Sequence, residues 1–304
     1  MQPIPQRRSV LARHMPGVYS ARDTPNRAGR VSNTGSTHRP RFAIVDESAI
    51  AVPYSCRQPM NPFELHLWLA DLDTVGATVS DLAEDERQRA ERIRDPVQRR
   101  LFIGGRAALR QILSQYLNQP PRALRVSSGA GIKPTLGPDS ALRFNVSRCR
   151  NLQLCALAEN APVGVDLEHV DDAGLREVAS TYFTPPERAW VRSQPVTGQP
   201  AALARLWTIK EACLKALGTG LQRPLHTVRI PLTPGVPIAD ASQSVRVEID
   251  GDGAWRVWLV TPSPGWTGAI AAADRAWTLR HFDLTPSGGT REGWTPGPAP
   301  PARA

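Results

Sequence analysis

The segment VGVDLEHV, residues 163–170, restricts the possible folds more than any other stretch of this chain. Its apolar residues alternate with Gly164, Asp166 and Glu168, which is the period-two pattern of a β-strand. Such a strand has one apolar face and one acidic face. Two carboxylates held this close repel each other unless a cation or a proton lies between them. We therefore expect a positive partner from another part of the chain.

A second pattern follows at residues 206–221, LWTIKEACLKALGTGL. Trp207, Glu211 and Lys215 recur every four residues and so share one face of a helix, and Gly218 is a natural left-handed C-cap. Three carboxylates on two rigid elements can hold Mg²⁺, a hard cation that prefers oxygen ligands and shares phosphate oxygens. A neighbouring lysine would neutralise the phosphate charge that the metal leaves.

Each pattern has a simpler interpretation when it is taken alone. Glu211 and Lys215 could form an exposed i,i+4 ion pair, which would stabilise the helix by only about 0.2–0.5 kcal/mol. Asp166 and Glu168 could be solvated charges on the outer face of an edge strand. The occurrence of both patterns in one chain favours the metal-site interpretation.

Composition and charge exclude several other classes of protein. The net charge of +9 is concentrated in residues 1–42, which hold eight arginines and one acidic residue, so the rest of the chain is nearly neutral and lacks the basic excess of a nucleic-acid binder. No apolar run is long enough to span a membrane. The four cysteines form no CxxC pair, which indicates reduced thiols and a cytoplasmic protein.

Strand and helix patterns alternate along the chain and predict an α+β fold. The order strand, helix, strands occurs twice, so we expect a pseudo-twofold, duplicated α/β unit with two lobes, residues 45–158 and 159–285, and a ligand cleft between them. The Arg-rich residues 1–44 and the Pro/Gly-rich residues 286–304 are predicted to be disordered. The expected strands are 64–73, 141–148, 152–158, 163–170, 245–250, 254–261, 268–273 and 278–284, and the expected helices are 80–94 with Ser80 as N-cap, 98–117, one capped by Thr184 and Glu187, and 201–217.

Several segments resemble the 4'-phosphopantetheinyl transferases of the Sfp type. GVDLEHV, YFTPPERAWV and LWTIKEACLKALGTGL are similar to the C-terminal blocks of that family. HLWLADLD, the run from Asp85 to Leu113, IKP and FNVSRC are similar to its N-terminal blocks. The resemblance spans residues 64–284 in the order of the family.

The resemblance implies an enzyme with the two-lobed fold of that family, with coenzyme A and Mg²⁺ in the cleft. It implies transfer of the 4'-phosphopantetheine arm of coenzyme A to a serine of an apo acyl or peptidyl carrier protein, with release of 3',5'-ADP. It also implies a post-translational modification that serves secondary metabolite biosynthesis, while the sequence leaves open which carrier protein is modified. We expect a monomer, and a docking surface for the acidic carrier formed by the arginines of residues 87–110.

The resemblance also assigns roles to individual residues. It matches the metal-binding acids with Asp166, Glu168 and Glu211, the lysine near the diphosphate with Lys215, and the groups that contact coenzyme A with Arg89, Arg106, Lys133, Ser147 and Arg148. The chain departs from the family pattern at two of these blocks. Arg148 stands where the family has histidine, and Ile132 where it has glycine. Arginine can replace the histidine as a phosphate ligand because it carries a permanent charge.

Simpler interpretations of these residues remain open from the sequence. Lys133 could be a solvated turn residue, Arg89 and Arg106 could be surface arginines, and Arg148 could form a structural ion pair. Cys149 and Cys213 are expected to fill the core.

In the mechanism that the resemblance implies, the carrier serine attacks the phosphorus attached to the pantetheine arm. Glu211 or a metal-bound water takes the serine proton, and the sequence does not distinguish them. Lys215 stabilises the charge on the leaving phosphate. The alternative is a metal-dependent nucleic-acid enzyme or binder, but the nuclease pattern needs a lysine two residues after its acid, where this chain has Val170 after Glu168.

Overall fold

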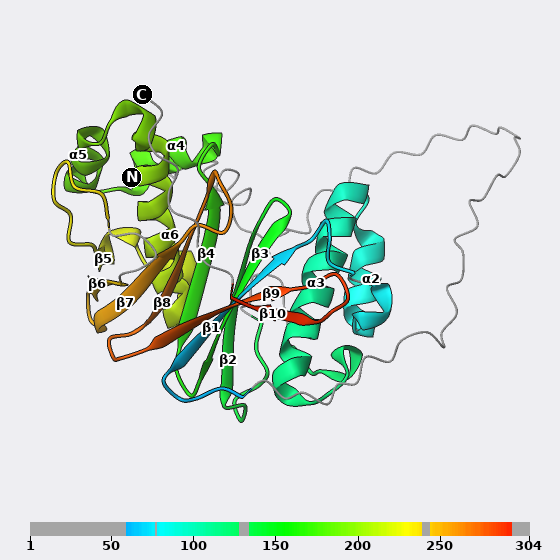
Figure 1. Ribbon diagram of the computed structural model, residues 1–304. Helices are drawn as coiled ribbons and strands as arrows, with labels where there is room; N and C mark the ends of the chain where they lie inside the picture. The colour runs from blue at the N-terminus through cyan, green and yellow to red at the C-terminus, as the bar shows by residue number, and fades with distance from the viewer. Residues whose placement is uncertain (1–58, 77, 128–133, 239–243, 294–304) are drawn as a thin grey trace, which may run out of the picture.

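The protein is a mixed α+β structure built on two β-sheets whose strands are mostly antiparallel (Figure 1). The computed structural model describes residues 59–76, 78–127, 134–238 and 244–293. Within these ranges the first sheet has the strand order β10 (Thr290–Glu292), β9 (Thr278–Leu284), β1 (Glu64–Asp71), β3 (Leu152–Glu159) and β2 (Leu142–Cys149). The second sheet has the order β4 (Val163–His169), β8 (Trp266–Ala273), β7 (Gly253–Val260), β6 (Ser244–Ile249) and β5 (Val228–Arg229).

The two halves of the chain repeat one topology, which confirms the predicted duplicated unit. In the first half β1 is followed by helix α3 (Pro96–Leu117) and the hairpin β2–β3, and β1 pairs antiparallel with β3. In the second half β4 is followed by helix α6 (Gln199–Leu217) and the hairpin β7–β8, and β4 pairs antiparallel with β8. Each unit therefore places its long helix on one face of its own sheet.

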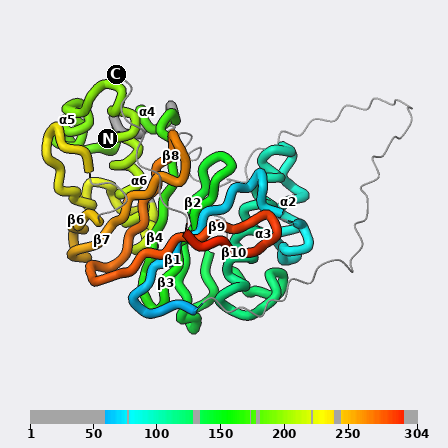
Figure 2. The backbone as a smooth tube through the Cα atoms, in the orientation of Figure 1, coloured from blue at the N-terminus to red at the C-terminus, as the bar shows by residue number. Residues whose placement is uncertain are grey.

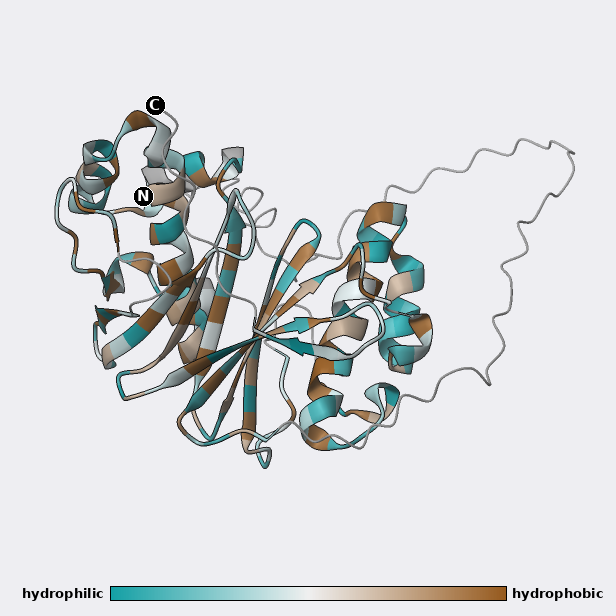
Figure 3. Ribbon diagram, in the orientation of Figure 1, coloured by the Kyte–Doolittle hydropathy of each residue, from teal (hydrophilic) through white to brown (hydrophobic). Residues whose placement is uncertain are grey.

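The sheets pack against each other, and the helices cover their outer faces (Figures 1 and 2). Alternate residues of β1 and β4, such as Leu65, Leu67, Val163 and Val165, belong to the apolar core between the sheets. The opposite side of the first sheet packs on α3, and that of the second on α6. Hydrophobic residues accordingly recur along the strands of both sheets in Figure 3, as expected where both faces of a sheet are covered.

The helix ends follow the predicted capping signals in the second half. Thr184 accepts from the backbone N–H of Glu187, whose carboxylate accepts from Thr184 N, so the predicted capping box begins α5 (Pro185–Ser193). Gly218 ends α6 with a φ of 75°. The remaining α-helices among the described residues are α2 (Glu84–Arg92) and α4 (Ala173–Tyr182), with 3₁₀ turns at Val79–Asp81, Pro121–Ala123, Val196–Gly198, Gly220–Gln222 and Leu225–Thr227.

The predicted start of the first helix is wrong. Ser80 lies inside a 3₁₀ turn, and α2 begins at Glu84 with Ala83 at its N-cap, where the Glu86 carboxylate accepts from Ala83 N. The acidic residues of its first turn stabilise this later start through the helix dipole.

The C-terminal strands return to the first sheet. β9 pairs in parallel with β1, and β10 pairs with β9. β10 lies within residues 286–304, which were predicted to be disordered, so that prediction is wrong for Thr290–Glu292. The division into lobes at residues 158 and 159 stays a prediction, and residues 278–284 lie in the sheet of the first lobe rather than the second. The predicted extension 1–44 lies outside the described residues. No helix among the described residues is long and apolar enough to cross a membrane.

Candidate active site

Strand β4 directs its acidic face toward α6. Val163, Val165 and Leu167 point into the core between the sheets, so Gly164, Asp166 and Glu168 point the other way. Asp166 is 3% exposed and Glu168 is 7% exposed. The interpretation of these acids as solvated charges on an outer face is therefore wrong.

The close approach of α6 depends on Gly164. A Cβ atom at this position would lie 2.0 Å from the carbonyl oxygen of Ala212 and 2.4 Å from the backbone nitrogen of Ala216. Glycine thus lets the helix backbone pack directly on the strand. Because Glu211 and Lys215 adjoin these two alanines, the same contact brings their side chains to the acids of β4.

Three elements meet at the carboxylate of Asp166. Lys215 Nζ donates to Asp166 Oδ1 at 2.6 Å and to Ser147 Oγ at 3.1 Å. Ser147 Oγ donates to the same Asp166 oxygen at 2.9 Å. Glu211 is 5% exposed, so Glu211 and Lys215 do not form the exposed ion pair of the simpler interpretation. The direct contact of Ser147 with Asp166 was not expected from the sequence, because it joins the two halves of the chain.

A second contact between the halves fixes the register of β4 against β2. The side-chain oxygen of Asn145 accepts from the backbone N–H of Val165 at 2.8 Å, and both groups are buried. Asn145 and Ser147 lie two residues apart on one face of β2. Side chains of β2 therefore hydrogen-bond both to the backbone of Val165, next to Asp166, and to the carboxylate of Asp166.

The buried acids raise one another's proton affinity. Burial and the charge of Asp166 raise the pKa of Glu168 well above its usual value. Burial raises the pKa of Glu211 to about 7, although Lys215 opposes this shift. Burial alone would lower the pKa of Lys215, but the charges of Asp166 and Glu211 outweigh it and raise this pKa. The site therefore has more negative charge than one ammonium group compensates.

The acid cluster fits a divalent cation chemically. In the described ranges no three His, Cys, Asp or Glu side chains are grouped closely enough to form a ligand set. Two carboxylate oxygens, Asp166 Oδ2 and Glu211 Oε1, are nevertheless buried without a hydrogen-bond partner among the described residues. Leaving such oxygens unsatisfied is unfavourable, and oxygen ligands of this kind are those that Mg²⁺ prefers. Asp166, Glu168 and Glu211 therefore have the donor chemistry for this ion, but their side chains would have to move closer together to bind it.

Arginines gather beside the end of β2. The guanidinium carbons of Arg89 and Arg106 lie 5.4 and 5.8 Å from the ring centre of Phe102. Arg148 donates to the carbonyl oxygen of Leu101, one residue before that ring, at 2.6 Å. Arg89, Arg106 and Arg148 therefore lie around one turn of α3, whereas Lys133 falls outside the described residues.

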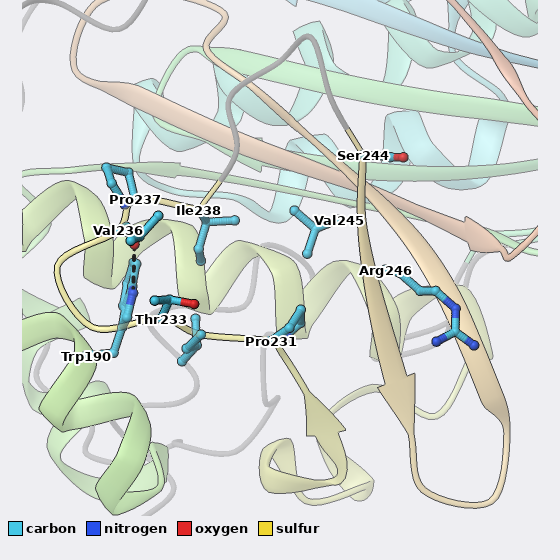
Figure 4. Close-up of a pocket in the computed structure, with 10 residues that line it drawn as sticks. Trp190, Pro231, Thr233, Val236, Pro237, Ile238, Ser244, Val245 and Arg246 are labelled. Carbon is cyan, nitrogen blue, oxygen red and sulfur yellow. Dashed lines mark hydrogen bonds between the residues drawn. The ribbon is translucent and has the colours of Figure 1, made fainter.

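Two further features lie apart from this chemistry. Cys213 is free and buried in the core as predicted, and burial raises its pKa to about 12. Cys149 was also expected to fill the core but is only partly buried. A pocket of about 290 Å³ on the second lobe has walls from Trp190 and the loop around Val236, joined by a hydrogen bond from Trp190 Nε1 to Val236 O at 3.0 Å (Figure 4). None of the acids lines this pocket, so it is not the candidate active site.

Known proteins are similar to the part of this chain that carries the acids of the site. The sequence profile of the 4'-phosphopantetheinyl transferase superfamily matches residues 162–271. The 4'-phosphopantetheinyl transferase HetI of Nostoc sp. is 35% identical over 227 residues, which are 72% of this chain and 92% of that protein. This chain belongs to the 4'-phosphopantetheinyl transferases.

Other relatives of this transferase agree with the assignment. The 4'-phosphopantetheinyl transferase Sfp of Bacillus subtilis is 23% identical over 154 residues, 51% of this chain and 68% of that protein. The 4'-phosphopantetheinyl transferase gsp of Aneurinibacillus migulanus is 31% identical over 123 residues, 40% of this chain and 50% of that protein. The protein is thus an enzyme of a family that transfers phosphopantetheine from coenzyme A to carrier proteins. The nucleic-acid alternative finds no support among these matches.

Proposed function

We propose that this transferase moves the 4'-phosphopantetheine arm of coenzyme A to a serine of an apo carrier protein in a Mg²⁺-dependent reaction that releases 3',5'-ADP. The observation that carries the proposal is the buried group of Asp166, Glu168 and Glu211 next to Lys215. An excess of buried carboxylates beside one ammonium is suited to a cation and a diphosphate together. No other charged cluster among the described residues combines these features with the family match.

Asp166, Glu168 and Glu211 would hold Mg²⁺. The two unsatisfied buried oxygens of Asp166 and Glu211 support this assignment, and the buried Glu168 lies two residues after Asp166 on the same face of β4. When bound, the cation would neutralise charge on the diphosphate and act as a Lewis acid toward it.

Two of the chain's own groups would act on the reacting atoms, and a third would orient the site. Glu211, which is buried at the acid cluster, is our candidate for taking the serine proton. The serine oxygen forms a bond to the phosphorus that carries the pantetheine arm, and the bond from that phosphorus to the leaving 3',5'-ADP oxygen breaks. Lys215 would stabilise the negative charge on the leaving group. Ser147 would orient Lys215 and Asp166 through its hydroxyl.

The arginines around Phe102 would bind the remaining phosphate charge of coenzyme A. Arg89 and Arg106 stack on that ring, which supports their orientation. Arg148 would join them, and Lys133 is proposed from the sequence alone. Arg110 was expected to belong to the docking surface for the carrier, but it is 2% exposed and donates to Glu86, so it is not part of that surface. The remaining arginines of residues 87–110 are also our proposed docking surface for an acidic carrier. If so, the KM for the carrier should rise with salt, because exposed charge pairs are screened.

Mass spectrometry of a carrier protein tests the proposed reaction. The purified chain is incubated with coenzyme A, Mg²⁺ and an apo carrier, and we expect the carrier to gain the mass of one phosphopantetheine arm as 3',5'-ADP accumulates. Removal of the metal with EDTA should stop the reaction, and Mg²⁺ should restore it. Unchanged transfer in EDTA would refute the metal assignment, and an unmodified panel of apo carriers would refute the function.

A substitution within the acid cluster tests the residue assignment. Asp166→Ala removes an acid that Lys215 and Ser147 both contact, so we expect transfer to fall by at least about 100-fold. Asp250→Ala removes a half-exposed carboxylate that pairs with Arg229 in the turn after β6, and it should leave transfer unchanged. Full activity of Asp166→Ala in a folded protein would contradict the assignment.

A monomeric protein in the cytoplasm is part of the same proposal. Sedimentation at assay concentrations and fractionation of the source cells are the measurements that check it.

A further inference from the structure

A buried ion pair lies on the side of α6 that the acid cluster does not use. Lys210 is 0% exposed, and its ammonium nitrogen lies 2.6 Å from Glu187 Oε1. The same nitrogen donates to the carbonyl oxygens of Leu225 at 2.9 Å and Val228 at 2.7 Å. An ammonium group has three N–H donors, and all three meet an acceptor here.

Glu187 divides its two carboxylate oxygens between two elements. One oxygen accepts from the backbone N–H of Thr184 at 2.8 Å in the capping box of α5. The other oxygen accepts the charge-assisted hydrogen bond from Lys210. The start of α5, the middle of α6 and the chain that enters β5, including its first residue Val228, are therefore joined at one buried point.

Stability alone is a weak explanation for this pair. Removing two charges from water is unfavourable, and a buried ion pair can often be replaced by apolar residues of similar size without loss of stability. Unlike an apolar contact, the hydrogen bonds of this pair require a particular orientation of the two side chains. Three short hydrogen bonds from one nitrogen fix both the height and the rotation of the helix turn that carries it.

Glu211 directly follows Lys210, and successive helical residues point about 100° apart. Lys210 faces α5 and β5 while Glu211 faces Asp166 and Glu168 on β4. We propose that Lys210 and Glu187 are positioning residues, which set the rotation of α6 about its axis and thereby the place of the Glu211 carboxylate. The proposal rests on the proposed function of Glu211 at the reacting centre.

A small rotation is enough to matter. A side-chain atom about 6 Å from the helix axis moves about 1 Å when the helix turns by about 10°. A displacement of about 1 Å at a reacting group can lower a rate by about 100-fold. Correct placement of the Glu211 carboxylate relative to the acids of β4 therefore requires that α6 does not rotate about its axis.

The test removes both charges together, so that no unpaired charge stays buried. In Lys210→Met with Glu187→Gln, methionine keeps the length of the side chain and glutamine keeps an acceptor for Thr184 N. We expect thermal unfolding close to that of the parent, a kcat at least about 10-fold lower, a higher Mg²⁺ concentration for half-maximal rate, and an unchanged KM for the carrier. Leu203→Ala, a partly buried change earlier on α6, serves as the control for loss of packing and should leave kcat and the Mg²⁺ dependence unchanged.

Crystal structures of the parent and the double variant give a readout that does not depend on activity. We expect the Glu211 carboxylate of the variant to shift by about 1 Å relative to Asp166. Superimposable carboxylates, or a kcat and Mg²⁺ dependence within about twofold of the parent, would overturn the positioning role. If the parent shows no Mg²⁺-dependent transfer, the proposed function fails, and the two structures still decide the positioning role. If the double variant does not fold, Glu187→Gln alone is measured, with the same changes expected at smaller size.

Discussion

Ser147, Asp166 and Lys215 come from three different elements and share one carboxylate oxygen. None of these side chains could hold the arrangement alone, because each is oriented by the other two. Glu211 adds a carboxylate whose pKa is raised to about 7 by burial, while the neighbouring acids raise the pKa of Lys215. The site therefore holds a carboxyl group that keeps its proton more readily than usual next to a lysine that stays charged. At the level of single residues, the chemistry therefore depends on charges that water does not screen.

A second buried titratable group, His66, couples the pH to the stability of the first sheet. Its ring nitrogens lie 2.8 Å from Tyr116 Oη and 3.1 Å from Glu64 Oε2. Burial lowers the pKa of His66, and the neighbouring Glu64 carboxylate only partly opposes this shift. The folded protein thus resists a proton that the unfolded chain accepts near pH 6.5.

We predict that the free energy of unfolding falls as the pH drops below about 6.5, by up to about 1.4 kcal/mol per pH unit for this group, until the lowered pKa of the folded state is reached. Above about pH 6.5 its contribution is fully present. Urea unfolding between about pH 7.5 and 5.5 measures the slope, and His66→Gln should reduce it. Burial also lowers the pKa of His281, so the test is the difference between parent and variant. Equal slopes would contradict the prediction.

At the scale of elements, the packing of α6 on β4 decides whether the site forms. The two backbones meet at Gly164, where neither the carbonyl of Ala212 nor the nitrogen of Ala216 can move without moving the helix. Glu211 and Lys215 lie on the same two turns of that helix. A single missing methyl group thus sets the distance between the acids of the strand and the charged groups of the helix.

Gly164→Ala should separate the two elements. We expect a loss of about 1–3 kcal/mol in unfolding free energy, the usual result of overpacking, and a loss of transfer larger than the loss of folded protein. The control is Gly104→Ala in α3, where the added Cβ would lie at an ordinary 3.5 Å from Leu72 and alanine favours the helix. Denaturant unfolding and the carrier assay are measured on both variants. Normal activity in Gly164→Ala would show that the close contact is not needed.

Local signals in the sequence predicted the elements around the site well. The capping box at Thr184, the C-cap at Gly218 and the alternation of β4 depend on neighbours in the chain, and the structure confirms all three. Ser80 was misplaced because a later acidic turn competes as the helix start. The ion pair of Lys210 with Glu187 could not be predicted, since it needs the packing of two helices that periodicity does not define.

At the scale of the whole molecule, the chain crosses from the first sheet to the second and back. β9 follows the last strand of the second sheet and pairs in parallel with β1, more than half the chain away. Its Phe282 is fully buried and stacks on Trp68 with ring centres 4.9 Å apart. No local pattern in the sequence specifies such a partner, so β9 was assigned to the second lobe.

This return strand predicts that the first lobe cannot fold without the C-terminal end of the chain. A chain that ends at residue 276 lacks β9 and β10, which exposes the edge of β1 and leaves Trp68 without its stacking partner. We expect it to aggregate, whereas a chain that ends at residue 293 should unfold at the same denaturant concentration as the parent. Phe282→Ala tests the same contact in a full-length chain and should lower the unfolding free energy by about 3–5 kcal/mol. A soluble chain ending at residue 276 with the parent's unfolding midpoint would mean that the first sheet folds without β9 and β10. The contact of Ser147 with Asp166 would then not depend on these strands, and transfer should survive the deletion.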